Sequence, residues 1–227
     1  MDRWTLNLAS KYNKQRPGYA ALYNTYQMYL KSAPDTLSKH LAEALEKGFT
    51  LGIKLVRGAY LESEPRHLIH DTKLNTDESY DGVSEGLLNK RYGSWLKAYN
   101  GADLAFPAIN VNLATHNLVS VEKVRQLRNS QSELTRSLTP LSYAQLHGMA
   151  DEVSCSLLQA QSVAEGTGNE PPQTFKYTSW GSTKECLTYL LRRAAENRDA
   201  VSRTRVTRLA MGQEIRQRIM DVFRSAR

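Results

Sequence analysis

Short runs of β-branched and aromatic residues recur along the chain, and stretches with helical periodicity separate them. Five runs predict strands, and they lie within residues 21–30, 49–60, 109–117, 143–149 and 175–181. Helices are expected at residues 2–13, 35–48, 83–100, 120–130, 151–161 and 182–197, while residues 62–82 are polar without a clear period. Strands that alternate with helices in this way predict an α/β fold built on a parallel sheet.

Two α/β architectures fit this pattern. An eight-stranded β/α barrel needs about 250 residues, whereas five strands are visible in these 227 residues. The chain is therefore either an open doubly wound sheet or part of a barrel. In both architectures the active site lies at the carboxyl ends of the strands, and here each predicted strand ends in polar residues or glycine.

The polar residues at these strand ends are of the types that bind a flavin. A flavin needs hydrogen bonds to its ring edge and cations for its pyrophosphate, and Gln27, Lys54, Arg57, Thr115 and His116 could supply both. Each also has a purely structural interpretation: Lys54 could form an ion pair inside a barrel, and His116 could hydrogen-bond a neighbouring strand. The sequence has no GxGxxG or Walker A motif, and its histidines lack metal-ligand spacing.

The segment YLLRRAAEN places two adjacent arginines in a run of leucines and alanines. On a helix, Tyr189, Arg192, Arg193 and Glu196 share one face, opposite an apolar stripe. One interpretation is the solvated face of an amphipathic surface helix. The other is a pocket for an anionic substrate, because arginine forks match the two oxygens of a carboxylate.

Charge is concentrated at the end of the chain. The formal net charge is +7, and residues 198–227 hold eight arginines against three acidic residues. A basic segment can bind nucleic acid or an anionic membrane surface, or it can be a solvated helix. We favour the solvated helix and expect no nucleic acid partner, because the arginines are not interleaved with base-stacking aromatic residues. The two cysteines indicate neither a disulfide framework nor a metal site.

Six segments taken in order carry a family resemblance: YNTYQMYLK, KLVRGAYLESE, ATHN, QLHGM, KYTSWG and YLLRRAAEN. Together they resemble the proline dehydrogenases, in the monofunctional, mitochondrial-type branch of the family. These flavoenzymes oxidise L-proline to 1-pyrroline-5-carboxylate. The resemblance implies a TIM-type β/α barrel, of which this chain would hold about the last five β/α units. Residues 1–197 would form this part of the barrel, and residues 198–227 a basic helical tail.

The resemblance also implies roles for individual residues. FAD would contact the following set: Gln27, Lys54, Arg57, Gly58, Ala59, Lys73, Thr115, His116, Asn117 and Glu196. Lys54 stands where some family members have an arginine. Arg192 and Arg193 would bind the proline carboxylate. The proline ring would be walled by Tyr60, Leu146, Tyr177 and Tyr189. No residue is assigned as an acid or base, and no metal is expected.

The remaining expectations concern partners and completeness. By resemblance, the electron acceptor would be a quinone of the respiratory chain, and the protein would form homo-oligomers. The resemblance also implies a mitochondrial location with inner-membrane association, although no targeting segment is visible in the sequence. The family's Asp-Ala-Glu motif and substrate-binding lysine are not found, so an N-terminally truncated chain is expected. Two alternatives stay open: an inactive fragment that partners a full-length paralogue, and an enzyme for another cyclic imino acid such as hydroxyproline.

Overall fold

The computed structural model describes most of the chain. The described residues are 2–58, 60, 64–99, 105–133, 138–167, 171–196, 208–209 and 211–220. Side chains are not described at 132, 133, 163, 165–167 and 192–196. No helix among the described residues is both long and apolar enough to cross a membrane.

Among the described residues up to Glu196, five strands alternate with six α-helices. The strands are β1 (Tyr23–Gln27), β2 (Leu51–Val56), β3 (Ile109–Ala114), β4 (Leu141–Leu146) and β5 (Gln173–Tyr177). The helices are α1 (Asp2–Tyr12), α2 (Ala33–Lys47), α3 (Lys73–Leu88), α4 (Leu118–Glu133), α5 (Asp151–Thr167) and α6 (Thr183–Glu196), with a 3-10 turn η1 (Arg66–Leu68). Residues 208–209 and 211–220 are also helical.

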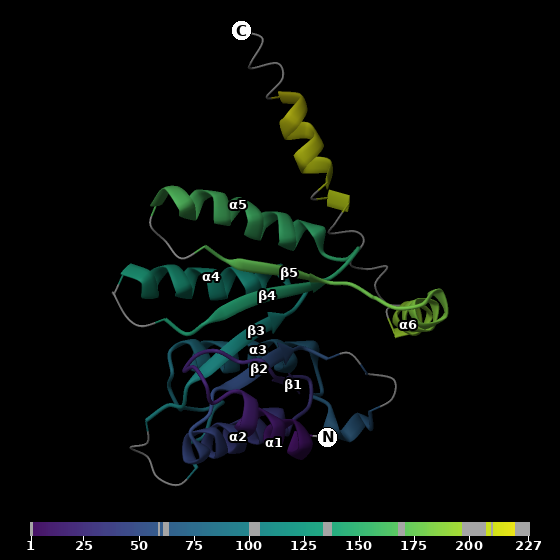
Figure 1. The fold of residues 1–227 in the computed structure, drawn as a ribbon. Coiled ribbons are helices and arrows are strands. Elements are labelled where there is room, and N and C mark those ends of the chain that lie inside the picture. The colour runs from purple at the N-terminus through teal and green to yellow at the C-terminus, as the bar shows by residue number, and fades with distance from the viewer. Residues whose placement is uncertain are drawn as a thin grey trace.

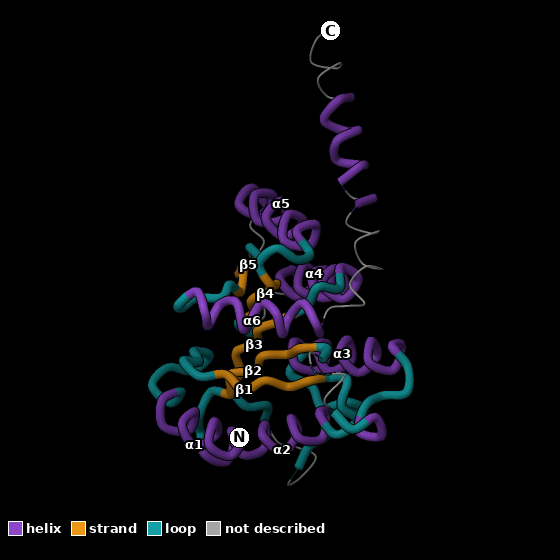
Figure 2. Tube along the Cα trace, turned by 90° about the vertical axis from the view of Figure 1, so that its right-hand side faces the viewer, coloured by secondary structure: helices purple, strands orange, loops and turns teal. Residues whose placement is uncertain are grey.

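The five strands form one parallel sheet in the order β1-β2-β3-β4-β5, so each strand pairs with its neighbour in sequence. The helices α2 to α5 follow the outer side of this sheet, and α6 lies off the carboxyl ends of the strands (Figures 1 and 2). A doubly wound sheet would reverse its strand order at a switch point and carry helices on both faces. The sequential order instead belongs to a β/α barrel.

The sheet is curved across its inner face. Lys54 on β2 and Tyr177 on β5 lie on strands that β3 and β4 separate. In a flat sheet this separation would be about 14 Å, at about 4.8 Å per strand. The Lys54 Nζ atom nevertheless lies 5.4 Å from the centre of the Tyr177 ring. Side chains from distant strands therefore meet over the inner face, as in a barrel interior.

The core lies between the sheet and the helices on its outer side. Outward-facing strand residues such as Ile53, Leu55, Val111 and Leu113 are buried in it. Helix α2 packs there, and residues in its first turn and at its end determine where the helix begins and stops. Proline stands in its first turn, and Gly48 ends it with φ 62°, its N–H bonding to carbonyls of the last turn.

The expected strands are all confirmed to within a few residues, but the expected helix at 83–100 is wrong. The helix α3 begins at Lys73, inside the polar segment without a clear period, and ends at Leu88. Two glycines within it weaken the helical pattern. Packing requires the first, because a Cβ on Gly82 would collide with the ring of Trp95. A Cβ on Gly86 would lie 2.9 Å from Leu96 Cδ1, which would have to shift.

Candidate active site at the carboxyl ends of the strands

The strand ends bring five predicted site residues to one edge of the sheet. Gln27, Leu146 and Tyr177 are the last residues of β1, β4 and β5, while Arg57 and Thr115 directly follow β2 and β3. Because parallel strands end on the same side, these residues share one rim.

Two predicted substrate residues, Tyr177 and Tyr189, lie together on the inner side of this rim. Their ring centres are 6.3 Å apart, and the planes are inclined by 51°. The ammonium of Lys54 approaches Tyr177 over the sheet. Two tyrosine faces offer apolar area for a small ring, and the lysine offers positive charge beside it.

The structural interpretation of His116 is confirmed. Its Nε2 atom accepts a hydrogen bond of 3.0 Å from the backbone N–H of Leu146. This bond holds the imidazole between the ends of β3 and β4. It leaves Nδ1 as the ring nitrogen that carries the proton.

The amino end of α4 is capped by residues predicted to bind the cofactor. The Asn117 Oδ1 atom accepts from Ser120 N at 3.1 Å, and Thr115 Oγ1 accepts from Asn117 N at 3.1 Å. Thr115 is buried, with 5% of its surface exposed. These bonds fix the helix start at the rim, where its positive dipole end favours an anion.

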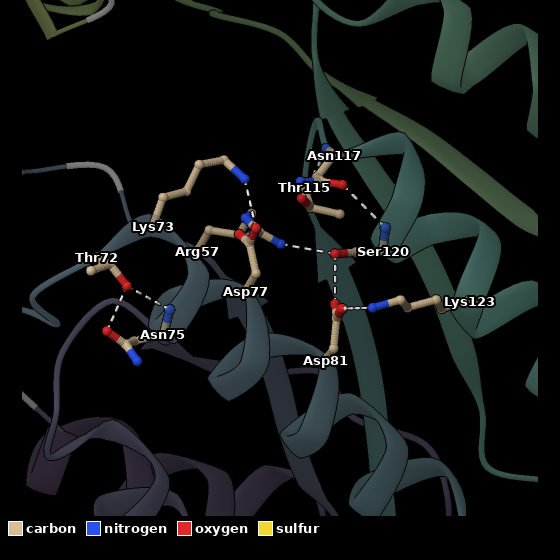
Figure 3. A network of polar contacts seen from close by, with 10 residues as sticks. All are labelled: Arg57, Thr72, Lys73, Asn75, Asp77, Asp81, Thr115, Asn117, Ser120 and Lys123. Atoms are coloured by element: carbon tan, nitrogen blue, oxygen red, sulfur yellow. Dashed lines mark hydrogen bonds and ion pairs between the residues drawn. The ribbon is translucent and has the colours of Figure 1, made fainter.

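The guanidinium of Arg57 is enclosed by α3 and α4. Its Nη2 atom forms an ion pair with Asp77, and its Nη1 atom donates to Ser120 Oγ at 2.8 Å (Figure 3). The ring of Tyr80 lies 5.2 Å from the guanidinium carbon. Burial lowers the pKa of Arg57 from its ordinary value. Lys73 reaches the same acid, with Nζ 2.6 Å from Asp77 Oδ2.

A pocket of about 520 Å³ opens beside these residues. The first turns of α3 and α4 and the side chain of Trp95 form its walls. Lys73 pairs with Asp77 one turn further along α3, and Lys123 of α4 pairs with Asp81 of α3. Burial lowers the pKa of Lys73, and the nearby Arg57 adds to this shift.

The helix α6 is anchored at its start by a capping box. Ser182 N donates to Glu185 Oε2 at 2.9 Å, and Glu185 N donates back to Ser182 Oγ at 3.4 Å. The side chains of Arg192, Arg193 and Glu196 lie outside the described part of the chain. Their predicted roles therefore stay predictions.

Three further predicted residues follow β2. Gly58 lies against Tyr29, since a Cβ there would come within 2.5 Å of the ring. This close packing requires a glycine whether or not a cofactor is bound. Tyr60 is partly exposed, at 38% of its surface. Ala59 falls outside the described residues.

Four site residues are missing from the sequence-based prediction: Asp77, Asp81, Ser120 and Lys123. They form one hydrogen-bonded network with Arg57 and Lys73 (Figure 3). Two signals could have found them: the i, i+4 spacing of Lys73, Asp77 and Asp81, and the place of Ser120 three residues after Asn117.

Comparison with known proteins decides the family. Residues 1–206 match the family model described as proline dehydrogenase. The chain belongs to the proline dehydrogenase family. A probable mitochondrial proline dehydrogenase of Schizosaccharomyces pombe is 36% identical over 96% of this chain. Mitochondrial proline dehydrogenase 2 of Arabidopsis thaliana is 33% identical over 92%, and a hydroxyproline dehydrogenase of Bos taurus is 31% identical over 94%.

The proline dehydrogenase match covers only part of these relatives. The chain spans 44%, 40% and 43% of their respective lengths. Among solved structures, the bifunctional proline utilization A (PutA) protein superposes with a TM-score of 0.55 at 24% identity. That superposition covers 76% of this chain and 16% of the other. It supports the barrel-type fold.

Proposed function

We propose that this member of the proline dehydrogenase family oxidises L-proline to 1-pyrroline-5-carboxylate with a bound FAD. One observation carries the proposal: five of the residues that family resemblance assigns to cofactor and substrate gather at the carboxyl ends of five consecutive parallel strands, namely Gln27, Arg57, Thr115, Leu146 and Tyr177. Oxidation removes a hydride from C5 and a proton from nitrogen, which leaves a C5–N double bond. We assign no side chain as the base that takes this proton.

The groups at the rim fit the anionic half of a flavin dinucleotide. Arg57 and Lys73, which share the carboxylate of Asp77, and the capped start of α4 lie next to the 520 Å³ pocket. The two cations and the positive end of the helix dipole are the donors that a phosphate would take there. A pyrophosphate requires such donors, and carboxylates alone would repel it. When bound, the flavin supplies the acceptor for the hydride that leaves C5. Arg57, Lys73 and Asn117 would hold its phosphates, and Gln27 and Lys54 would approach its ring.

The substrate would lie between α6 and the inner face of the sheet. The rings of Tyr177 and Tyr189 provide an apolar wall that excludes water from the pyrrolidine. Arg192 and Arg193, on the same helix as Tyr189, would bind the carboxylate as a pair. The main task of these residues is to place C5 and to keep water out.

The cellular setting is part of the same proposal. We infer a mitochondrial location, since the relatives from Schizosaccharomyces pombe and Arabidopsis thaliana are named mitochondrial. Electrons would pass to a quinone-type acceptor at the inner membrane. The protein would work as a homo-oligomer.

The test is a titration of the 227-residue chain loaded with FAD. L-proline added without oxygen should bleach the flavin absorbance, and trans-4-hydroxy-L-proline should do so more slowly. Faster bleaching by hydroxyproline would favour the activity named for the Bos taurus relative. Retained absorbance with both substrates, or no bound flavin at all, would contradict the proposal and favour a non-enzymatic partner of a longer paralogue.

A further inference from the structure

A polar chain that crosses from α3 to α4 sets the direction of the Arg57 guanidinium. Its Nη1 atom donates to Ser120 Oγ at 2.8 Å. Ser120 in turn donates to Asp81 Oδ1 at 2.6 Å, and Lys123 Nζ donates to Asp81 Oδ2 at 2.6 Å. The contacts join the four side chains into one continuous hydrogen-bonded line, which bends at Ser120 and at Asp81 (Figure 3).

The order of donors in this line restricts the rotation of the Ser120 hydroxyl. A serine hydroxyl has a single proton, so donation to Asp81 turns its lone pairs toward Arg57. Asp81 is a charged acceptor, which makes that donation short and strong. Lys123 satisfies the second carboxylate oxygen and offsets its charge. Removing any link lets the hydroxyl rotate away from the guanidinium.

Burial differs along the line in a way that matches a support role. Ser120 is 3% exposed, and the Arg57 and Asp81 side chains are 18% and 20% exposed. Lys123 is 61% exposed. The line thus runs from solvent inward and ends at the residue that the proposed function places against the cofactor phosphates.

We propose that Ser120 and Asp81, completed by Lys123, are positioning residues that hold Arg57 in the orientation that binds the anionic half of the cofactor. This inference rests on the proposed function. It adds that cofactor affinity depends on side chains that act through the Arg57 guanidinium. Asp77 holds the other edge of the guanidinium, so the support comes from both helices.

The experiment measures FAD affinity of the apoprotein by quenching of flavin fluorescence. Ser120→Ala should raise the dissociation constant about tenfold, as expected for a lost bond to a charged group. Asp81→Asn should raise it as well, because the new amide group would face the Lys123 ammonium. Ser120→Thr keeps the hydroxyl and should bind within about twofold of the wild type. Urea unfolding confirms that each variant is folded.

Matched controls and a double-mutant cycle separate positioning from general stability. Ser130→Ala, on the exposed side of α4, and Glu85→Gln, on the exposed side of α3, should leave affinity unchanged. In an Arg57→Lys background, Ser120→Ala should add no further loss, because its effect acts through the guanidinium.

Three results would overturn the inference. If Ser120→Ala and Ser130→Ala bound FAD with equal affinity, the hydrogen-bonded line would have no effect on cofactor binding. Fully additive effects of Arg57→Lys and Ser120→Ala would show that Ser120 acts elsewhere. A wild-type chain that binds no FAD would remove the proposed function and this inference together, whereas the first two results would leave the proposed function intact.

Discussion

Asn13 joins three segments of the chain through a single side chain. Its Nδ2 donates to the carbonyls of Leu22 and Thr50, at 2.9 and 3.0 Å. Its Oδ1 accepts from the N–H groups of Ala21 and Leu22, at 3.0 and 3.1 Å. The residue is 1% exposed. It therefore fixes the end of α1 against the entrances of β1 and β2.

Asn13→Ala should lower the free energy of unfolding by about 3 kcal/mol, because backbone groups that are buried lose their partners. Asn13→Asp should be at least as costly, since a carboxylate oxygen would then face two carbonyls. Urea denaturation checks both. Asn7→Ala, at an exposed position of α1, is the control. An Asn13→Ala midpoint equal to that of the control would refute this account.

The contacts of single residues are the feature that the sequence predicts least well. The structural alternative for His116 could be named beforehand, because the end of a strand faces its neighbour's backbone. Asn13 could not, since its partners depend on how two loops fold back over α1. The network of Asp81, Ser120 and Lys123 likewise arises only when α3 and α4 pack side by side.

At the scale of elements, α2 is tied to the segment that follows α3. The hydroxyl of Tyr99 donates to Asp35 in the first turn of α2, and Lys39 also pairs with Asp35 at 2.8 Å. The hydrogen bonds from Lys39 and then Tyr99 lower the pKa of Asp35 from 3.8 to about 2. A carboxyl with a lowered pKa stabilises the fold above its unfolded pKa and loses this contribution in acid.

Asp35→Asn should therefore unfold more easily than the wild type at pH 7. Its stability should also fall less steeply between about pH 4 and pH 2, because the variant has no such carboxylate to protonate. Urea midpoints measured across this range test the difference. Parallel curves for the two proteins would show that the Asp35 contacts do not contribute.

Elements with a strong pattern were predictable, and α3 shows the limit. Most strands carry several β-branched or aromatic residues, which mark them without knowledge of their neighbours, whereas β4 has Tyr143 alone. The amino half of α3 is polar, and its glycines weaken the helical signal. Its start could still have been found, because Thr72 caps it by accepting from Asn75 N at 3.1 Å.

At the scale of the whole molecule, the strand order decided between the two architectures that the pattern of strands and helices allows. Five strands in 227 residues fit both an open sheet and a barrel. The choice depends on the side to which each crossover turns, which local composition does not encode. The resulting sheet is helix-covered on its outer side, while its last strand is largely exposed, with Phe175 at 55%.

The exposed strand predicts self-association. Within the described part of the chain, β5 pairs with β4 alone, so its second edge is free to pair. The sedimentation coefficient should rise with concentration, and Phe175→Lys should return it toward the monomer value. Trp4→Lys, on the exposed side of α1, should not. A wild-type chain that stays monomeric at all concentrations would count against an interface at β5.

The sequential strand order also bears on how the chain acquires its structure. Among the described strands, β2 to β5 each pair with the strand made just before them. A ribosome releases the chain in that same order. Each new β/α unit can therefore dock on a sheet edge that already exists, and the nascent chain can fold progressively as it emerges.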